Sequence, residues 1–275
     1  MKFAICNETF GEWPLERTAA FAAECGYRGI EIAPFTLGAT AAEIPAAARV
    51  TARRAAEAAG LEVTGLHWLL AKTSGLHLAS PEVAVRAATA DYLGDLARLC
   101  RDLGGRVLVL GSPQQRNLLP GVSRAEALDH VTDVLERVVP ALEATEVLLA
   151  VEPLSPPYCD FLCSADEAVE LIERVAAPAV RLNLDCLAMS AEALPIPEIV
   201  RRHHALLVHF HANDPNCRGP GFGELDFVPI LAALGEVDYR GWVSVEVFDY
   251  DPGPERLARE SIDYLYRCLA QIAAE

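Results

Sequence analysis

The chain has 275 residues, 52% of them hydrophobic, and a formal net charge of −16 at pH 7. This length suits one α/β domain with a large core, so we expect a single domain over residues 1–275. The acidic balance disfavours nucleic acid and anionic membranes as partners. No apolar run approaches the length of a membrane span, and the opening MKFAICNETF does not read as a leader. We therefore expect a cytoplasmic protein.

The eight cysteines are scattered, without repeated CxxC pairs, and we interpret them as free thiols. The closest pair, Cys159 and Cys163, could form half of a zinc site, but no second half accompanies it. We assign no role to the cysteines.

Short β-rich runs alternate with long stretches of helical period, and this alternation repeats eight times along the chain. Strands are predicted at residues 3–6, 29–32, 63–69, 106–110, 147–152, 180–185, 206–211 and 242–247. Helices are predicted at residues 14–25, 45–59, 81–103, 123–145, 164–176, 195–204, 227–234 and 254–274. Ser123 with Glu126, and Ser164 with Glu167, match the capping-box pattern.

Eight strand-then-helix units predict a closed (β/α)8 barrel, the TIM barrel. The alternative is an open doubly wound sheet. No GxGxxG motif follows the first predicted strand and no P-loop lysine motif occurs, so the barrel is favoured.

Four acidic or imidazole side chains end four successive predicted strands. They are Glu152 in VLLAVEP, Asp185 in VRLNLDC, His211 in LLVHFHAND and Glu246 in WVSVEVF. The intervals are 33, 26 and 35 residues, each close to one strand-plus-helix unit, so a barrel would bring all four to its C-terminal mouth.

Three carboxylates converging with one imidazole need a cation to balance their charge. This ligand set suits one divalent ion of the Mn²⁺, Mg²⁺ or Co²⁺ type, and Zn²⁺ is compatible. The alternative is that each acid only caps a helix or pairs with a surface arginine.

Further polar residues are predicted near the same mouth. His67 lies near the end of the third predicted strand and Glu31 near the end of the second, and each could bind substrate or be a satisfied buried group. Glu8 and His77 are weaker candidates, because loop residues near strand ends need not point inward.

Two other residues, Arg218 and His209, also have a functional and a structural interpretation. Arg218 lies in the glycine-rich loop NDPNCRGPGFGELDF, where it could hold a substrate oxygen or pair with an acid in solvent. His209 shares the strand face of His211 one layer deeper, and we expect it to be a hydrogen-bonded core residue or to lie behind the ligands, rather than to be a ligand itself.

These motifs resemble the xylose-isomerase-like barrels of the sugar isomerase and epimerase group. The resemblance runs from ICNETF through GIEIAP and GLHWLL to SVEVF, and it is strongest in AVEP, NLDCLAM, HFHAND, RGPGFGELDF and SVEVF. It implies a single TIM-barrel domain that takes a sugar as its substrate.

The ketose 3-epimerase members of that group imply roles for individual residues. Their metal ligands match Glu152, Asp185, His211 and Glu246. The two glutamates also form the acid/base pair of these members, and their substrate-binding arginine matches Arg218. One position departs from the pattern, because these members carry a substrate-binding histidine where this chain has Ala188.

We therefore expect a metal-dependent isomerase or epimerase that acts on a sugar or sugar derivative through an enediolate. The alternatives are dehydration of a keto-inositol or a dehydroshikimate-like compound, and sugar binding without catalysis. An endonuclease role on abasic DNA is disfavoured by the charge of −16. Free and phosphorylated sugars are both compatible with the sequence, and so is a homo-oligomer.

Overall fold

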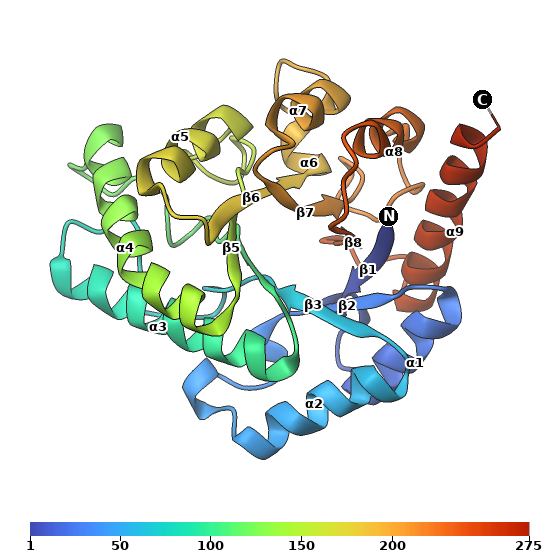
Figure 1. The fold of residues 1–275 in the computed structure, drawn as a ribbon, viewed down its shortest axis with the longest axis horizontal. Coiled ribbons are helices and arrows are strands. Elements are labelled where there is room, and N and C mark those ends of the chain that lie inside the picture. Colours follow the sequence, from blue (N-terminus) through green and yellow to red (C-terminus); the bar gives the residue numbers. More distant parts are fainter. Residues whose placement is uncertain (275) are drawn as a thin grey trace.

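The computed structural model describes residues 1–274, whose strands form a closed parallel barrel in the order β1 to β8. Strand β1 pairs with both β2 and β8, which closes the sheet. Figure 1 shows the strands at the centre and the helices around them. The strands are β1 Lys2–Cys6, β2 Gly29–Ile32, β3 Glu62–Leu66, β4 Val107–Leu110, β5 Leu148–Val151, β6 Val180–Asp185, β7 Leu207–Ala212 and β8 Trp242–Val245. The predicted barrel is confirmed and the open sheet is excluded.

The α-helices follow the strands as the sequence predicts. They are α1 Leu15–Cys25, α2 Ala46–Ala58, α3 Val83–Leu103, α4 Arg124–Thr145, α5 Ala165–Val175, α6 Cys186–Met189, α7 Ile196–His203, α8 Phe227–Glu236 and α9 Pro254–Ile272. Short 3-10 helices are η1 Asn7–Phe10, η2 Pro34–Thr36 and η3 Ala41–Glu43. Helix α6 was not predicted, because four residues are too few to show a helical period.

Two helices begin at the predicted caps. Ser123 and Glu126 form a complete capping box at the start of α4. At α5 the Ser164 hydroxyl accepts from the Glu167 backbone N–H, but the Glu167 carboxylate accepts from the Cys163 N–H instead of closing the box. Both hydroxyls satisfy an N–H that the helix itself cannot satisfy.

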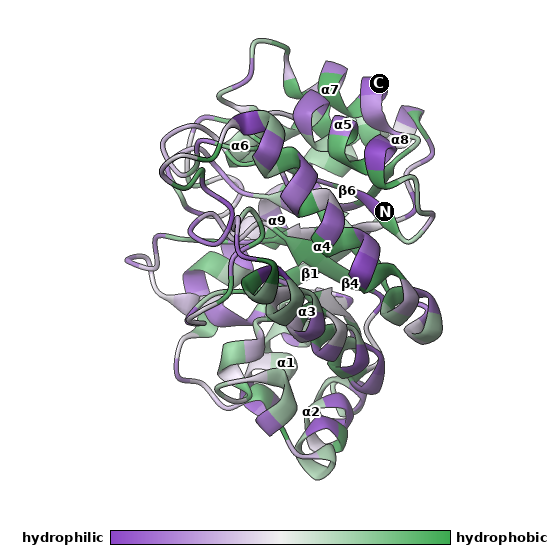
Figure 2. Cartoon of the chain, turned by 90° about the vertical axis from the view of Figure 1, so that its left-hand side faces the viewer, coloured by the Kyte–Doolittle hydropathy of each residue, from purple (hydrophilic) through white to green (hydrophobic). Residues whose placement is uncertain are grey.

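The core lies between the strands and the helices. Strand β2 is buried along its whole length, and its neighbours β1 and β3 are buried except at their first residues. Figure 2 shows hydrophobic strands at the centre and helices that carry both hydrophobic and hydrophilic residues, as expected of helices packed on one side. No helix within residues 1–274 is long and apolar enough to cross a membrane.

The cysteines are free thiols, as predicted. Cys159 Sγ and Cys163 Sγ lie 3.6 Å apart without a bond between them, in the loop that follows β5.

Candidate metal and substrate site

The four predicted ligands meet at the C-terminal ends of β5 to β8. Glu152, Asp185, His211 and Glu246 are all buried, and each offers a ligand atom within 4.8 Å of the others. His211 Nδ1 lies 2.9 Å from Glu152 Oε1 and 2.9 Å from Glu246 Oε2. The predicted convergence is therefore present, and ion binding by these residues stays a prediction.

Two asparagines orient the ligands, and the sequence interpretation missed both. Asn183 Nδ2 donates to Glu152 Oε1 at 2.7 Å, and Asn213 Nδ2 donates to Asp185 Oδ2 at 2.6 Å. Asn183 precedes Asp185 by two positions, and Asn213 follows His211 by two. The two-residue period of a strand was the signal that could have identified them, because it puts each asparagine on the face of a ligand.

Tight contacts also fix the two glutamates. The Trp68 indole Nε1 donates to Glu246 Oε1 at 3.0 Å, from a backbone with φ of 53° that a bulky residue adopts only under constraint. Beside the other glutamate, a Cβ placed on Gly111 would overlap Glu152 Oε2. Glycine at this position therefore leaves the space that the Glu152 carboxylate occupies.

The electrostatics of the cluster fit a bound cation. Burial, together with the charges of Glu152 and Glu246, raises the pKa of Asp185 to about 8. Burial alone would lower the pKa of His211, but the Glu246 and Glu31 carboxylates outweigh it and raise that pKa well above its usual value. A divalent ion would offset the repulsion among these carboxylates. Three carboxylates and one imidazole are suitable donors for such an ion.

A second layer of polar groups lies beneath the ligands. Glu31 is fully buried, with Oε2 at 2.8 Å from His209 Nε2 and Oε1 at 3.3 Å from His211 Nε2. Burial opposes ionisation of Glu31, but the two imidazoles hold its pKa well below the usual value. This contact leaves His211 Nδ1 facing the carboxylates above. Glu31 thus contacts both imidazoles from below the cluster, and His209 bonds to Glu31 rather than to His211. Substrate binding by Glu31 stays a prediction.

His67 lies at the mouth, at the end of β3. Its Nε2 is 2.6 Å from Glu8 Oε2, and the ring lines a cavity next to the ligand cluster. Burial alone would lower the pKa of His67, but the Glu8, Glu31 and Glu246 carboxylates raise it to about 9. Substrate binding by His67 stays a prediction that its position supports.

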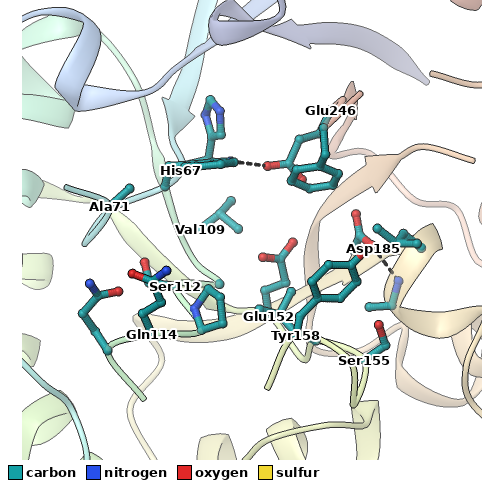
Figure 3. Close-up of a pocket in the computed structure, with 18 of the residues that line it drawn as sticks. His67, Ala71, Val109, Ser112, Gln114, Glu152, Ser155, Tyr158, Asp185 and Glu246 are labelled. Atoms are coloured by element: carbon teal, nitrogen blue, oxygen red, sulfur yellow. Dashed lines mark hydrogen bonds between the residues drawn. The ribbon is translucent and has the colours of Figure 1, made fainter. Parts of the chain in front are cut away.

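The cavity above the ligand cluster has a volume of about 560 Å³. Figure 3 shows the Glu152, Asp185 and Glu246 carboxylates turned toward a common space. Apolar side chains that line the cavity include Trp68, Ala71, Val109, Pro113, Leu154, Leu187, Ala188 and Phe248. Polar ones include Ser112, Gln114, Gln115, Ser155 and Tyr158. A cavity of this size and mixed lining is typical of a small-molecule site.

The two remaining positions of interest lie at the edge of the cavity. Ala188 donates its backbone N–H to Asp185 Oδ1 at 2.8 Å, while its small side chain leaves the adjoining space open. Arg218 is about one-third exposed, and its Nε lies 2.8 Å from Asp249 Oδ2. Cys217 lines the cavity and Arg218 is not among its lining residues in the described part of the chain. Substrate binding by Arg218 stays a prediction that requires its side chain to leave Asp249.

Known proteins share this fold and parts of this sequence. The family model described as xylose isomerase-like TIM barrel matches residues 19–268. The L-ribulose 3-epimerase of Mesorhizobium japonicum is 24% identical over 184 residues, which cover 67% of this chain but only 62% of that enzyme. The D-psicose 3-epimerase of Agrobacterium fabrum is 26% identical over 250 residues, covering 87% of this chain and 83% of that enzyme.

Solved structures give the same result for the fold. The crystal structure of a D-psicose 3-epimerase in the presence of D-fructose matches with a TM-score of 0.86 at 21% identity, covering 98% of this chain and 99% of that one. At this identity the match establishes the shared fold alone. Together with the family match over residues 19–268, it leads to one conclusion: the chain belongs to the xylose isomerase-like TIM barrel family.

Proposed function

We propose that the protein is a divalent-metal-dependent isomerase or epimerase of a sugar or sugar derivative. One observation carries the proposal. Glu152 and Glu246 both contact His211 Nδ1 at 2.9 Å, and both line the same cavity together with Asp185. Two carboxylates at one small-molecule site provide the acid/base pair that moving a proton on a sugar carbon requires.

The reaction begins with a substrate whose carbonyl carbon and neighbouring hydroxyl face the two glutamates. One glutamate takes the proton from the carbon beside the carbonyl, and the electrons of that C–H bond move onto the carbonyl oxygen to give an enediolate. When bound, a divalent ion at the four-ligand cluster would stabilise the negative charge on the substrate oxygens. The second glutamate returns a proton from the other face, which inverts the carbon and gives epimerisation. Aldose–ketose isomerisation results instead if the proton returns to the former carbonyl carbon and the hydroxyl proton moves to the former carbonyl oxygen, so that the hydroxyl becomes the new carbonyl.

The surrounding contacts support these roles for the glutamates. Asn183 holds Glu152 by one oxygen, and Trp68 holds Glu246 by one oxygen. Carboxylates that are held in this way keep a fixed position relative to the substrate carbon. Such fixed positions are how positioning contributes to catalysis.

The side chains that line the cavity indicate how a sugar would be oriented in it. Ala188 provides no polar side chain, and Trp68 and Phe248 present tilted rings with centroids 6.2 Å apart. Aromatic faces pack against the C–H faces of sugars, so we place the reacting end of the substrate at the carboxylates and its remainder against these rings. Gln114 and Gln115 supply donors and acceptors for hydroxyl groups.

Product analysis tests the proposal. The metal-stripped protein is incubated with a panel of ketoses, aldoses and their phosphates, with and without added Mn²⁺, and the sugars are separated by chromatography. We expect interconversion of at least one pair, dependent on the added ion. Intact sugars throughout the panel, despite measurable sugar binding, would indicate the non-catalytic barrel.

Dehydration is a second candidate, and it is supported by His67. The ring lines the cavity, and its pKa of about 9 keeps it protonated at neutral pH, so it can donate a proton to a departing hydroxyl group. In this reaction the enediolate loses a neighbouring hydroxyl as water instead of regaining a proton. An ultraviolet-absorbing enone or enol product from a keto-inositol would identify it.

A further inference from the structure

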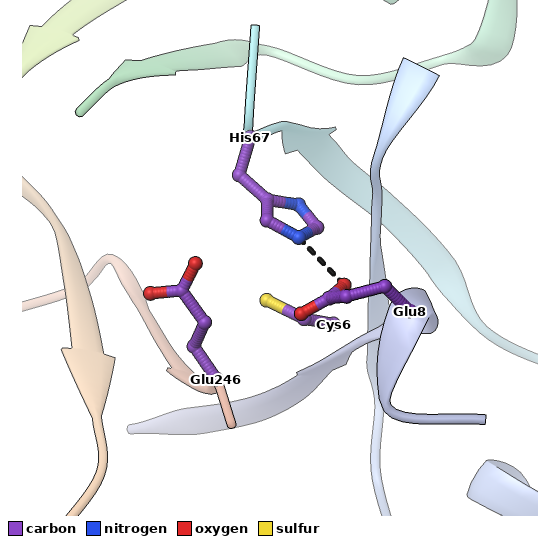
Figure 4. A group of neighbouring side chains, drawn as sticks. All are labelled: Cys6, Glu8, His67 and Glu246. Atoms are coloured by element: carbon purple, nitrogen blue, oxygen red, sulfur yellow. Dashed lines mark hydrogen bonds and ion pairs between the residues drawn. The ribbon is translucent and has the colours of Figure 1, made fainter. Parts of the chain in front are cut away.

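A second group of metal-binding side chains lies beside the first. Cys6 ends β1, Glu8 lies in η1, His67 follows β3 and Glu246 follows β8. All four are buried, and each offers a ligand atom within 4.8 Å of the others. Figure 4 shows the Cys6 sulfur, the His67 ring and the two carboxylates turned toward one another. Residues from three different strand ends therefore share one enclosed space.

Glu8 carries an oxygen that nothing in residues 1–274 satisfies. Its Oε2 contacts His67 Nε2 at 2.6 Å, but its Oε1 is buried and has no hydrogen-bond partner. Buried carboxylate oxygens are almost always hydrogen-bonded or bound to a metal. Glu8 Oε1 is thus available to bind a cation or a water molecule inside the cluster, and Cys6 offers only weak hydrogen bonding from its thiol.

The contacts within this group repeat those of the four-ligand cluster. There, His211 Nδ1 lies 2.9 Å from two carboxylates that are themselves candidate ligands. Here, His67 Nε2 lies 2.6 Å from the Glu8 carboxylate in the same way. In both groups an imidazole nitrogen and a carboxylate oxygen lie close enough for one cation to bind both of them.

We propose that Cys6, Glu8, His67 and Glu246 form a second divalent-cation site, with Glu246 shared between the two sites. The donor set is one thiolate, one imidazole and two carboxylates. Thiolate and imidazole ligands favour Zn²⁺ or Co²⁺, whereas the oxygen-rich first site suits Mn²⁺ or Mg²⁺. A carboxylate has two oxygens, so Glu246 can offer one to each ion.

Occupancy of the second site has a consequence for the chemistry at the mouth. His67 Nε2 cannot hold a proton and a cation at the same time, so the loaded site removes the acid that dehydration would use. Glu246 would also become a weaker base while it binds two cations, which leaves Glu152 as the stronger of the pair. The second cation site does not depend on which sugar reaction occurs, because the proposal rests only on the side chains that would bind the cation.

Cobalt binding provides the test. The full-length protein is stripped with a chelator, dialysed against Co²⁺, and measured for bound cobalt per chain and for thiolate-to-cobalt charge-transfer absorption. We expect two cobalt ions per chain and a charge-transfer band. Cys6→Ser should abolish the band and lower the stoichiometry to one, and Glu8→Gln should also lower it to one. Cys217→Ser, which changes a cysteine at the cavity edge, should leave both unchanged.

The two sites are separated by a third variant. Asp185→Asn changes a residue of the first cluster alone, so it should lose one ion and keep the band. Wild-type protein that binds one ion with no band, or a band that survives Cys6→Ser, would overturn the second site. Either result leaves the sugar reaction to be judged by product analysis alone. Circular dichroism melts confirm that each variant is folded. If Cys6→Ser does not fold, the cobalt stoichiometry of Glu8→Gln still tests the second site.

Discussion

Trp68 and Glu246 join the ends of β3 and β8 across the barrel mouth, with the indole Nε1 donating to Glu246 Oε1 at 3.0 Å. The two residues are far apart in the chain, and the tryptophan takes a backbone φ of 53° to reach the carboxylate. A hydrogen bond from a fixed donor limits the rotation of the carboxylate that accepts it. Trp68 therefore holds one of the two proposed acid/base groups in a single orientation.

Trp68→Phe should reduce turnover without releasing the metal of the first site. The change keeps an aromatic ring beside Phe248 but removes the N–H donor, so Glu246 becomes less well oriented. Losing a hydrogen bond to a charged group costs about 1.5–3 kcal/mol, which corresponds to a fall in kcat of at least about tenfold. Steady-state kinetics and metal content of the variant check this. Unchanged kcat would indicate that the indole only packs against the cavity wall.

The barrel and the convergence of the four candidate ligands could be predicted from the sequence, because both follow from the regular alternation of strands and helices. Alternation of strands and helices determines the topology, and Glu152 and Asp185 each follow an apolar strand run, so their place at the mouth is determined too. The depth of a side chain within the barrel does not follow from this alternation. Glu31 ends a strand like the others, yet it lies beneath the mouth, because His209 and His211 bond to it there.

Contacts made by loops were beyond prediction. Arg218 lies in a glycine-rich segment whose path depends on many weak turns, and its pairing with Asp249 could not be read from the spacing. The Glu8 contact with His67 joins residues 59 positions apart, through a 3-10 helix that gives no periodic signal. Such residues are located by tertiary packing, so their roles need the structure first and then experiment.

Removing a ligand of the first site should remove both metal and activity. Asp185→Ala and His211→Ala each take away one donor at the mouth, and the barrel should stay folded because mouth residues contribute more to function than to stability. We expect less than one ion in the first site and no measurable turnover. Metal analysis and circular dichroism check this. Full metal content in the Asp185→Ala, His211→Ala double variant would disprove the assigned ligands.

The stabilisation that a divalent ion provides should increase with pH. The pKa of Asp185 is raised from 3.8 to about 8 in the ion-free fold, so its charging costs stability as pH rises through this window. Metal binding requires the charged Asp185 carboxylate and the neutral His211 imidazole, so the ion competes with protons at both side chains and binds more tightly as the pH rises. With free ion at about 100 times Kd, the gain is about 2.7 kcal/mol.

Melting curves with and without Mn²⁺, at about pH 5.5 and about pH 8.5, measure this difference across the predicted window. We expect the metal-induced increase in Tm to be larger at the higher pH. Asp185→Asn provides the control, because the amide does not titrate, and the ion-free variant should lose less stability over the window. An equal Tm increase at both pH values would contradict the prediction.

Arg218 and Asp249 can be separated by a matched pair of variants. If Arg218 leaves its partner to bind substrate, Arg218→Ala should raise KM about tenfold without releasing metal. Asp249→Ala frees the same guanidinium, so it should leave KM unchanged or lower it. Equal losses in both variants would show that the ion pair only shapes the loop. Kinetics at saturating metal distinguish these outcomes.

The two glutamates provide the decisive test of the chemistry. Glu152→Gln and Glu246→Gln keep the shape of each side chain and one ligand oxygen, but they remove the base, so each should lower turnover by at least about 10²-fold at saturating metal. In deuterated water the wild-type protein should introduce deuterium at the carbon beside the carbonyl. A variant that keeps one base can still exchange that hydrogen with solvent while it fails to form product. The remaining glutamate can still remove and return the proton on one face of the enediolate. Exchange without product in one variant therefore assigns that glutamate to the return of the proton. Wild-type product that contains no solvent deuterium would instead indicate a hydride shift between adjacent carbons, and the two-glutamate mechanism would have to be abandoned.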